Sequence, residues 1–109
     1  MADLLGTFEQ AVLLAVWNLA AQAYGRAILL ETQVALDRSA AAGAVYTTLD
    51  RLEKKGLLSS RVQTGTPVRG GRARRYYRLT AAGIRALNES KAALEQMWRG
   101  TTWPLESKA

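Results

Sequence analysis

The chain of 109 residues contains no cysteine and no histidine. Disulfide bonds and thiolate metal sites are therefore excluded, as are the Ser–His, Cys–His and zinc arrangements of many enzymes. The nine acidic residues are scattered, and residues 65–71 lack the Gly-Lys-Ser/Thr signature of a phosphate-binding loop. These absences predict a protein that is not an enzyme and that uses no metal or cofactor.

Long apolar runs are also missing, since none reaches the roughly 18 residues of a membrane-spanning helix. The first residues carry Asp3 and Glu9 and lack the basic segment of a signal peptide, so we expect a cytoplasmic protein. Aromatic residues are few, whereas alanine and aliphatic residues are plentiful. This balance favours one domain built from helices with a small sheet.

Positive charge is concentrated in about a quarter of the chain. Residues 51–78 contain nine basic side chains and a single acid, Glu53, which gives this segment a net charge of +8. The whole chain has a net charge of only +6, so the remainder is slightly acidic. Such concentration predicts a surface that binds a polyanion. The alternative is a solvated basic loop with no partner.

Hydrophobic periodicity predicts a first helix that ends near residue 19 and three more that span about residues 25–36, 40–55 and 81–99. Strands are expected over residues 58–64 and 74–79, with a Gly/Pro loop at 65–72 between them and a possible stub of strand at 22–24. Thr7 with Gln10 fits a capping box, and Ser39 and Thr80 are the best N-caps for the third and fourth helices. The predicted fold is mostly α with a two-stranded β wing, a winged helix-turn-helix. Residues 1–80 would form the winged helix, 81–99 a dimerisation helix and 100–109 a flexible tail.

The third helix would enter the major groove of DNA, because it is the second helix of the motif. Val45, Leu49 and Leu52 define its buried stripe. The residues expected to contact DNA are Gly43, Tyr46, Thr47, Arg51 and Lys54 on its opposite side and Arg69, Arg72, Arg74 and Arg75 on the wing. A packing role against the wing is the alternative for Tyr46. Arg61 and Arg78 lie near the base of the wing, where they could pair with acids.

The first helix is apolar all round, which indicates burial on more than one side. Phe8, Val12, Ala15 and Leu19 can face its own domain. A second cover is needed for the other side, either from another subunit or from the last helix of the same chain. A seam of apolar residues on the last helix favours a partner helix. The predicted dimer interface therefore comprises Leu13, Val16, Trp17, Ile84, Leu87, Leu94 and Trp98.

The order of these motifs resembles the PadR family of bacterial transcriptional regulators. The residues that carry the resemblance are Leu5-Gly6, Phe8-Glu9, Tyr24-Gly25, Gly43 to Tyr46, Leu49 to Leu57, Gly70-Gly71-Arg72, Tyr76-Tyr77, Leu79-Thr80 and Gly83. The resemblance implies a homodimeric repressor that binds a pseudo-palindromic operator, of the branch with a single short C-terminal helix. It also implies that this helix packs against the partner's first helix.

Some relatives bind flat aromatic ligands between subunits, so Trp98 is a candidate contact for a small aromatic effector. The alternative for Trp98 is a packed interface residue. A winged helix can also serve as a protein-binding or RNA-binding module without operator specificity, and this is the alternative function.

Overall fold

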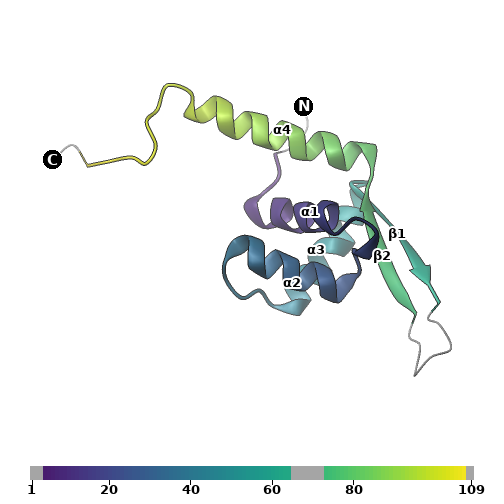
Figure 1. Ribbon diagram of the computed structural model, residues 1–109. Coiled ribbons are helices and arrows are strands. Elements are labelled where there is room, and N and C mark those ends of the chain that lie inside the picture. The colour runs from purple at the N-terminus through teal and green to yellow at the C-terminus, as the bar shows by residue number, and fades with distance from the viewer. Residues whose placement is uncertain (1–3, 65–72, 108–109) are drawn as a thin grey trace.

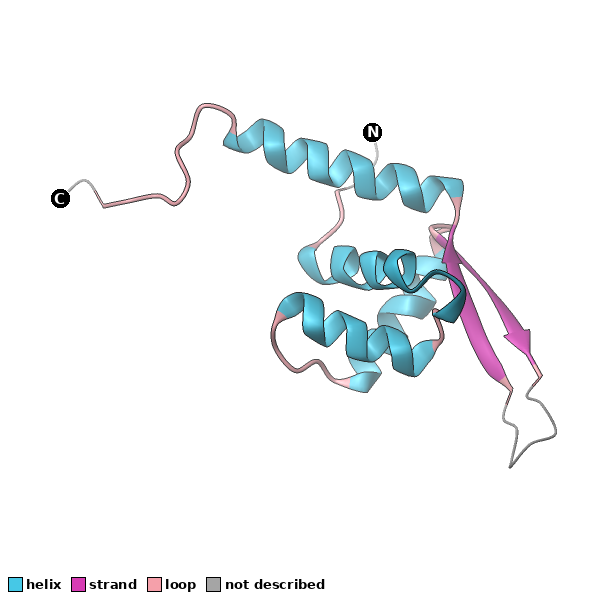
Figure 2. Ribbon diagram, in the orientation of Figure 1, coloured by secondary structure: helices cyan, strands magenta, loops and turns pink. Residues whose placement is uncertain are grey.

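The computed structural model describes residues 4–64 and 73–107, which form four α-helices and a two-stranded antiparallel sheet (Figure 1). The predicted order of three helices, two strands and a last helix is confirmed, as Figure 2 shows. The elements are α1 (Thr7–Leu19), the short 3-10 turn η1 (Ala20–Gln22), α2 (Gly25–Leu36), α3 (Ala42–Lys54), β1 (Leu58–Gln63), β2 (Arg74–Leu79) and α4 (Ala81–Trp98).

Helix α1 begins one residue earlier than the predicted capping box implies. Gly6 is the N-cap and Thr7 is already helical. The Glu9 carboxylate, and not Gln10, accepts the Gly6 N–H at 3.2 Å. The Gln10 amide instead donates to the Leu5 carbonyl at 2.9 Å. A carboxylate suits this position because it satisfies a free N–H and faces the positive end of the helix dipole.

The turn between α2 and α3 differs from its prediction. Helix α2 has the predicted bounds, and its C-cap Asp37 adopts a left-handed conformation with φ of 51°. Helix α3 starts at Ala42 with Ala41 as its N-cap, and no side chain caps it, so the prediction that Ser39 caps a helix from residue 40 is wrong. The Gln33 amide donates to the Ala40 carbonyl at 2.9 Å and so ties the turn to α2.

The C-terminal end of α3 follows the predicted glycine stop. Gly56 has a φ of +79°, a conformation that a residue with a Cβ adopts only with strain. Its N–H donates to the Glu53 carbonyl at 2.9 Å, and the Leu57 N–H donates to the Leu52 carbonyl at 3.0 Å. These two bonds are the Schellman motif, which fixes the direction in which the chain leaves α3 for the wing.

The wing is a regular hairpin whose register runs from Leu58 opposite Leu79 to Gln63 opposite Arg74. Strand β1 ends one residue before the predicted Thr64. The other edge of β2 is also bonded, because the Tyr77 N–H donates to the Ala23 carbonyl at 2.9 Å. Of the stub of strand predicted over residues 22–24, only Tyr24 pairs, in an isolated bridge with Tyr76, and Gln22 belongs to η1.

Helix α4 starts against the turn that follows α3. The Thr80 hydroxyl accepts the Gly83 N–H at 3.0 Å, which confirms it as the N-cap. The hydroxyl also donates to the Gly56 carbonyl at 2.6 Å, and the Thr80 N–H donates to the Leu57 carbonyl at 3.1 Å. Figure 1 shows α4 running along α1 and beyond the helical body. The buried Ser90 hydroxyl accepts the Leu5 N–H at 3.2 Å, which holds the N-terminal segment against α4.

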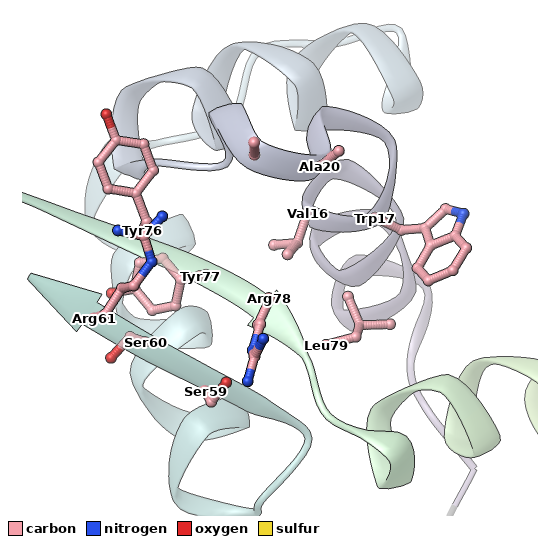
Figure 3. Close-up of a pocket in the computed structure, with 11 residues that line it drawn as sticks. Val16, Trp17, Ala20, Ser59, Ser60, Arg61, Tyr76, Tyr77, Arg78 and Leu79 are labelled. Carbon is pink, nitrogen blue, oxygen red and sulfur yellow. The ribbon is translucent and has the colours of Figure 1, made fainter. Parts of the chain in front are cut away.

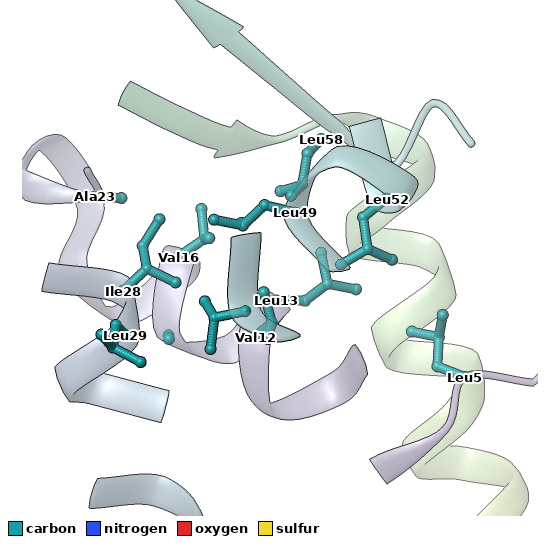
Figure 4. Close-up of a cluster of buried hydrophobic side chains, with 12 residues drawn as sticks. Leu5, Val12, Leu13, Val16, Ala23, Ile28, Leu29, Leu49, Leu52 and Leu58 are labelled. Carbon is teal, nitrogen blue, oxygen red and sulfur yellow. The ribbon is translucent and has the colours of Figure 1, made fainter. Parts of the chain in front are cut away.

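The core lies between the first three helices and the base of the sheet (Figure 4). Val45, Leu49 and Leu52 are fully buried, as predicted for α3. Leu13 and Val16 are also buried within the single chain, so the prediction that they need a second subunit is wrong. Burial of each such side chain contributes about 1.5–3 kcal/mol to folding. None of the helices in the described part of the chain is long and apolar enough to cross a membrane.

Candidate nucleic-acid interface

One face of α3 is buried and the other is open to solvent. The helix buries Val45, Thr48, Leu49 and Leu52, a stripe that repeats every three or four residues. The predicted contact residues on the opposite face are all exposed: Gly43, Tyr46, Thr47, Arg51 and Lys54. The buried stripe of α3 is therefore held in the core, while the opposite face is open to a partner.

Tyr46 combines an exposed edge with a packing contact. A Cβ placed on Gly25 would lie 2.9 Å from its ring carbon Cε1, so the ring lies directly over the start of α2. The side chain is still 45% exposed. Tyr46 therefore does make a packing contact, but this contact is with Gly25 of α2 and not the contact with the wing that the alternative proposed. The absence of a side chain at Gly25 lets α2 and α3 approach here.

The basic residues at the end of α3 have different partners. Lys54 forms an ion pair with Asp50 at 3.2 Å, one turn away, and both side chains remain largely exposed. A pair so exposed contributes little to stability, and Lys54 can exchange it for another anion at small cost. Lys55 pairs with Glu9 of α1 at 3.1 Å, so it joins the end of α3 to the start of α1.

The Glu9 carboxylate is partly buried, and burial alone would raise its pKa. Hydrogen bonds from Lys55 and from the Gly6 N–H, together with the positive charges of Lys55 and Arg51, outweigh burial and hold the pKa of Glu9 below its usual value. Glu9 is thus ionised at neutral pH, and Lys55 already has an anionic partner within the fold.

A chain of hydrogen bonds joins α3 to the wing. The Ser60 hydroxyl in β1 donates to the Glu53 carboxylate at 2.5 Å, and the Arg75 guanidinium in β2 donates to Ser60 at 2.9 Å. The single acid of the basic segment therefore sits between the helix and the hairpin. We call these three residues the Glu53–Ser60–Arg75 link. Since a hydrogen bond to a charged group is comparatively strong, the link favours one angle between α3 and the sheet.

Aromatic rings and arginines stack at the other edge of the sheet. The Arg74 guanidinium lies 4.2 Å from the centre of the Tyr24 ring, and Arg61 lies 5.1 Å from that of Tyr76. The two tyrosines meet edge to face, with their centres 5.8 Å apart. Arg61 also donates to the Gln63 amide at 2.9 Å. The expectation that Arg61 pairs with an acid is therefore wrong.

The Arg78 side chain makes no ion pair or hydrogen bond with the residues that the structure describes. The expected pairing of Arg78 with an acid is thus also wrong. Arg69 and Arg72, the other two wing residues predicted to contact DNA, lie outside the described residues.

A shallow hollow of about 330 Å³ connects α3 with the wing and the start of α2. Its walls include Tyr46 from α3 and Arg74 and Arg75 from β2, so three of the predicted contact residues meet at one place. Sequence analysis missed the exposed Arg26 and the half-buried Tyr24, which also line the hollow. The sequence signal for Arg26 is its position as a basic residue in the first turn of a predicted helix. Burial raises the pKa of Tyr77 at the floor of this hollow, so its phenol stays neutral.

The predicted dimer residues are divided by the fold. Trp17, Ile84, Leu94 and Trp98 are exposed, whereas Leu87 is half-buried against the core. The exposed members lie on the outside of α1 and on α4. Among the described residues, no group of three or more acidic side chains could hold a metal ion.

Comparison with known proteins gives concordant matches. Residues 13–89 match the transcriptional regulator PadR-like family. The transcriptional regulator Rv3488 of Mycobacterium tuberculosis is 51% identical over 57 residues, which are 52% of this chain and half the length of that relative. The structure of a PadR-like transcription factor from Bacteroides fragilis matches 86% of this chain and 85% of its own, with 26% identity and a TM-score of 0.70.

A PadR family transcriptional regulator from Eggerthella lenta is 30% identical, with a TM-score of 0.61. That match covers 84% of this chain and 80% of the other. The relatives are named as regulators of transcription and not as enzymes, which confirms the prediction against catalysis.

Proposed function

Because the chain belongs to the PadR-like family of transcriptional regulators, we propose that it binds double-stranded DNA as a homodimer and represses transcription at a pseudo-palindromic operator. We further propose that the protein acts in the cytoplasm of a bacterium. The observation that carries the proposal is the exposed face of α3, whose Tyr46 meets Arg74 and Arg75 of β2 at one shared hollow. The basic residues of this surface, Arg51, Lys54, Arg74 and Arg75, belong to the segment of residues 51–78, which has a net charge of +8.

Different residues of α3 would do different work on DNA. Arg51 is long and exposed and can donate two hydrogen bonds to the O6 and N7 atoms of one guanine. Thr47 can place its methyl group against a thymine methyl, or its hydroxyl on a phosphate. Gly43 has nothing within 4 Å of the position of a Cβ, which leaves room for a close approach of the DNA backbone.

Lys54 is farther along the helix and would contact a phosphate, for which it would leave Asp50. Tyr46 would present its exposed edge to the duplex while its ring stays on Gly25. On the wing, Arg74 and Arg75 would face the backbone beside the groove that α3 occupies. Arg69 and Arg72 are proposed for the same duplex from their place in the loop between the strands.

The homodimer is proposed from the apolar surface that one chain leaves exposed. Ile84, Leu94 and Trp98 on α4 and Trp17 on α1 are large side chains in contact with water, and a second copy could cover them. A twofold pair of recognition helices needs half-sites about 34 Å, or ten base pairs, apart. A small aromatic effector at Trp98 stays a prediction, with interface packing as its alternative.

The proposal is tested by comparing Arg51→Ala with Arg85→Ala, which removes an exposed arginine from α4 instead of α3. We expect Arg51→Ala to reduce the preference for the operator over random duplex by about 1–3 kcal/mol, because one base contact is lost. Arg85→Ala should retain the full preference. Fluorescence anisotropy titrations with a selected duplex, a shuffled duplex and a hairpin RNA measure these affinities. Equal binding of all three by the unmodified protein would instead favour a module without operator specificity.

A further inference from the structure

A second cavity, of about 750 Å³, lies between the C-terminal end of α1 and the sheet (Figure 3). Its apolar wall includes Val16, Trp17 and Leu79. Trp17 is 58% exposed, and Figure 3 shows its indole directed away from the helical body, beside Leu79. The cavity therefore offers a large apolar ring that the described part of its own chain leaves in contact with water.

The wall that the sheet contributes is positively charged. Arg61 and Arg78 line it from the two strands, and no acidic side chain does so in the part of the chain that the structure describes. Arg61 is held over the Tyr76 ring at 5.1 Å. The Arg78 side chain has no hydrogen-bond or ion-pair partner among the described residues. An occupant that carries an acid close to an apolar ring would match both walls.

The segment that follows α4 has this combination of side chains. Trp103 and Leu105 are 76% and 70% exposed, and the exposed Glu106 comes directly after them. We call residues 101–106 the α4 arm. Large apolar side chains gain free energy when they leave water, so two of them on one short segment favour a partner surface.

The α4 arm cannot bring Trp103 to the cavity of its own chain. The cavity lies at the start of α4, because Leu79 is in its wall. Helix α4 contains 18 residues, which separate its two ends by about 26 Å. The five residues from Trp98 to Trp103 span at most about 18 Å. Figure 1 also shows the chain after α4 running away from the sheet. A second protomer is therefore needed to place this ring in the cavity.

Antiparallel pairing of two α4 helices would bring the arm and the cavity together. The exposed Ile84, Leu94 and Trp98 of α4 belong to the proposed dimer surface. With a twofold axis across these helices, the end of each α4 lies beside the start of the other, where the cavity of that protomer opens. An interface of this symmetry forms each contact twice.

We propose that the α4 arm of each protomer occupies the cavity between α1 and the sheet of the other protomer, an inference that rests on the proposed homodimer. Trp103 would pack against Trp17 and Leu79. Glu106 would accept hydrogen bonds from Arg78, because guanidinium donors match the two oxygens of a carboxylate. The three residues from Trp103 to Glu106 span up to about 10 Å, which lets the arm cross from the apolar wall to the charged wall.

The contact is tested by cross-linking with a short bismaleimide, without DNA. The chain has no cysteine, so introduced thiols are the only ones. Thr102→Cys places a thiol beside Trp103, and Ala21→Cys places one in the wall of the cavity. We expect the protein with both substitutions to form a covalent dimer. Thr102→Cys alone should not, nor should Thr102→Cys combined with Ala35→Cys, which uses an exposed alanine of α2 outside the cavity.

The energetic contribution of the arm is tested by sedimentation equilibrium of the full chain, also without DNA. Trp103→Ala should raise the dissociation constant of the dimer about tenfold or more. Val34→Ala, which truncates an equally exposed side chain of α2, should leave it unchanged. Glu106→Arg and Arg78→Glu should each raise it about three- to tenfold, and the protein with both substitutions should recover, because the charge pair forms again in reverse.

The outcomes separate the arm from the dimer. A dimer that yields no cross-link between positions 21 and 102, that is unaffected by Trp103→Ala, or that does not recover when both charges are reversed would overturn the arm proposal and leave the homodimer standing. Covalent dimers of Thr102→Cys alone would show that the two arms meet each other, which would also overturn it. A protein that stays monomeric at high micromolar concentration would contradict the homodimer and the exchange of arms together.

Discussion

Replacement of Gly83 by alanine should destabilise the fold severely. A Cβ at this position would lie 2.1 Å from the carbonyl oxygen of Leu57 and 3.1 Å from its carbonyl carbon, whereas ordinary contacts begin at 3.4 Å. The obstacle is backbone, so it cannot rotate aside as a flexible side chain would. To make room, the first turn of α4 must move away from the Gly56–Leu57 turn.

That movement would break the two hydrogen bonds by which Thr80 holds the turn, at 3.1 Å to Leu57 and 2.6 Å to Gly56. Each bond contributes about 1 kcal/mol, and the steric strain adds about 1–3 kcal/mol. Alanine recovers about 1 kcal/mol through its higher helix propensity. The net loss is about 2–4 kcal/mol, which in a domain of this size lowers the melting temperature by roughly 10–30 °C.

The matched control is Gly43→Ala, the same substitution in α3. Nothing lies within 4 Å of the added methyl group, so we expect the free energy of unfolding to rise by about 0.5–1 kcal/mol. Urea denaturation followed by circular dichroism measures both variants. A Gly83→Ala protein as stable as the unmodified chain would refute the geometry of the α4 contact. If Gly43 approaches DNA closely, Gly43→Ala should bind its operator more weakly despite its greater stability.

Three further predictions concern single polar side chains. Glu9→Gln should lower the free energy of unfolding by about 1 kcal/mol at pH 7, because the ion pair with Lys55 and the charged cap are lost. Folding depresses the pKa of Glu9, so the contribution of the Glu9 carboxylate to stability is present above its unfolded pKa and disappears as pH falls through its folded pKa. Equal free energies of unfolding for Glu9→Gln and the unmodified chain at pH 7 would contradict this. The buried Thr32 hydroxyl has no hydrogen-bond partner among the described residues, so Thr32→Val should raise the free energy of unfolding by about 1 kcal/mol. A lower free energy of unfolding for this variant, measured by chemical denaturation, would show that the hydroxyl has a hydrogen-bond partner. Ser60→Ala breaks the Glu53–Ser60–Arg75 link and should weaken the binding of operator and random duplex alike, by about three- to tenfold in anisotropy titrations. Unchanged affinity for both duplexes would mean that the link does not orient the wing.

Much of the fold could be predicted because local patterns and tertiary packing agree. The spacing of Val45, Leu49 and Leu52 identifies the buried face of α3, and the Gly56–Leu57 pair identifies its end. The exposed residues of α3 follow from the same periodicity, since the face opposite a buried stripe must meet solvent. The charge of the wing could likewise be read from composition.

The prediction for Leu13 and Val16 is wrong because the apolar pattern of one helix does not show which other elements cover it. The all-apolar centre of α1 is covered by α2, α3 and the sheet of the same chain, whose combined reach the sequence pattern does not show. The Glu53–Ser60–Arg75 link could not be predicted either, because it depends on the angle between α3 and the hairpin. The cavity beside Trp17 likewise depends on how the end of α1 meets the sheet.

The most direct test of the proposed function is selection of bound duplexes from a random pool, with the affinity of the selected duplex then measured at several salt concentrations. We predict two half-sites related by a dyad, with centres about ten base pairs apart. If the dimer neutralises about eight phosphates, the log–log slope of affinity against salt should be near −7. A pool without enrichment, or a salt slope near zero, would contradict the account.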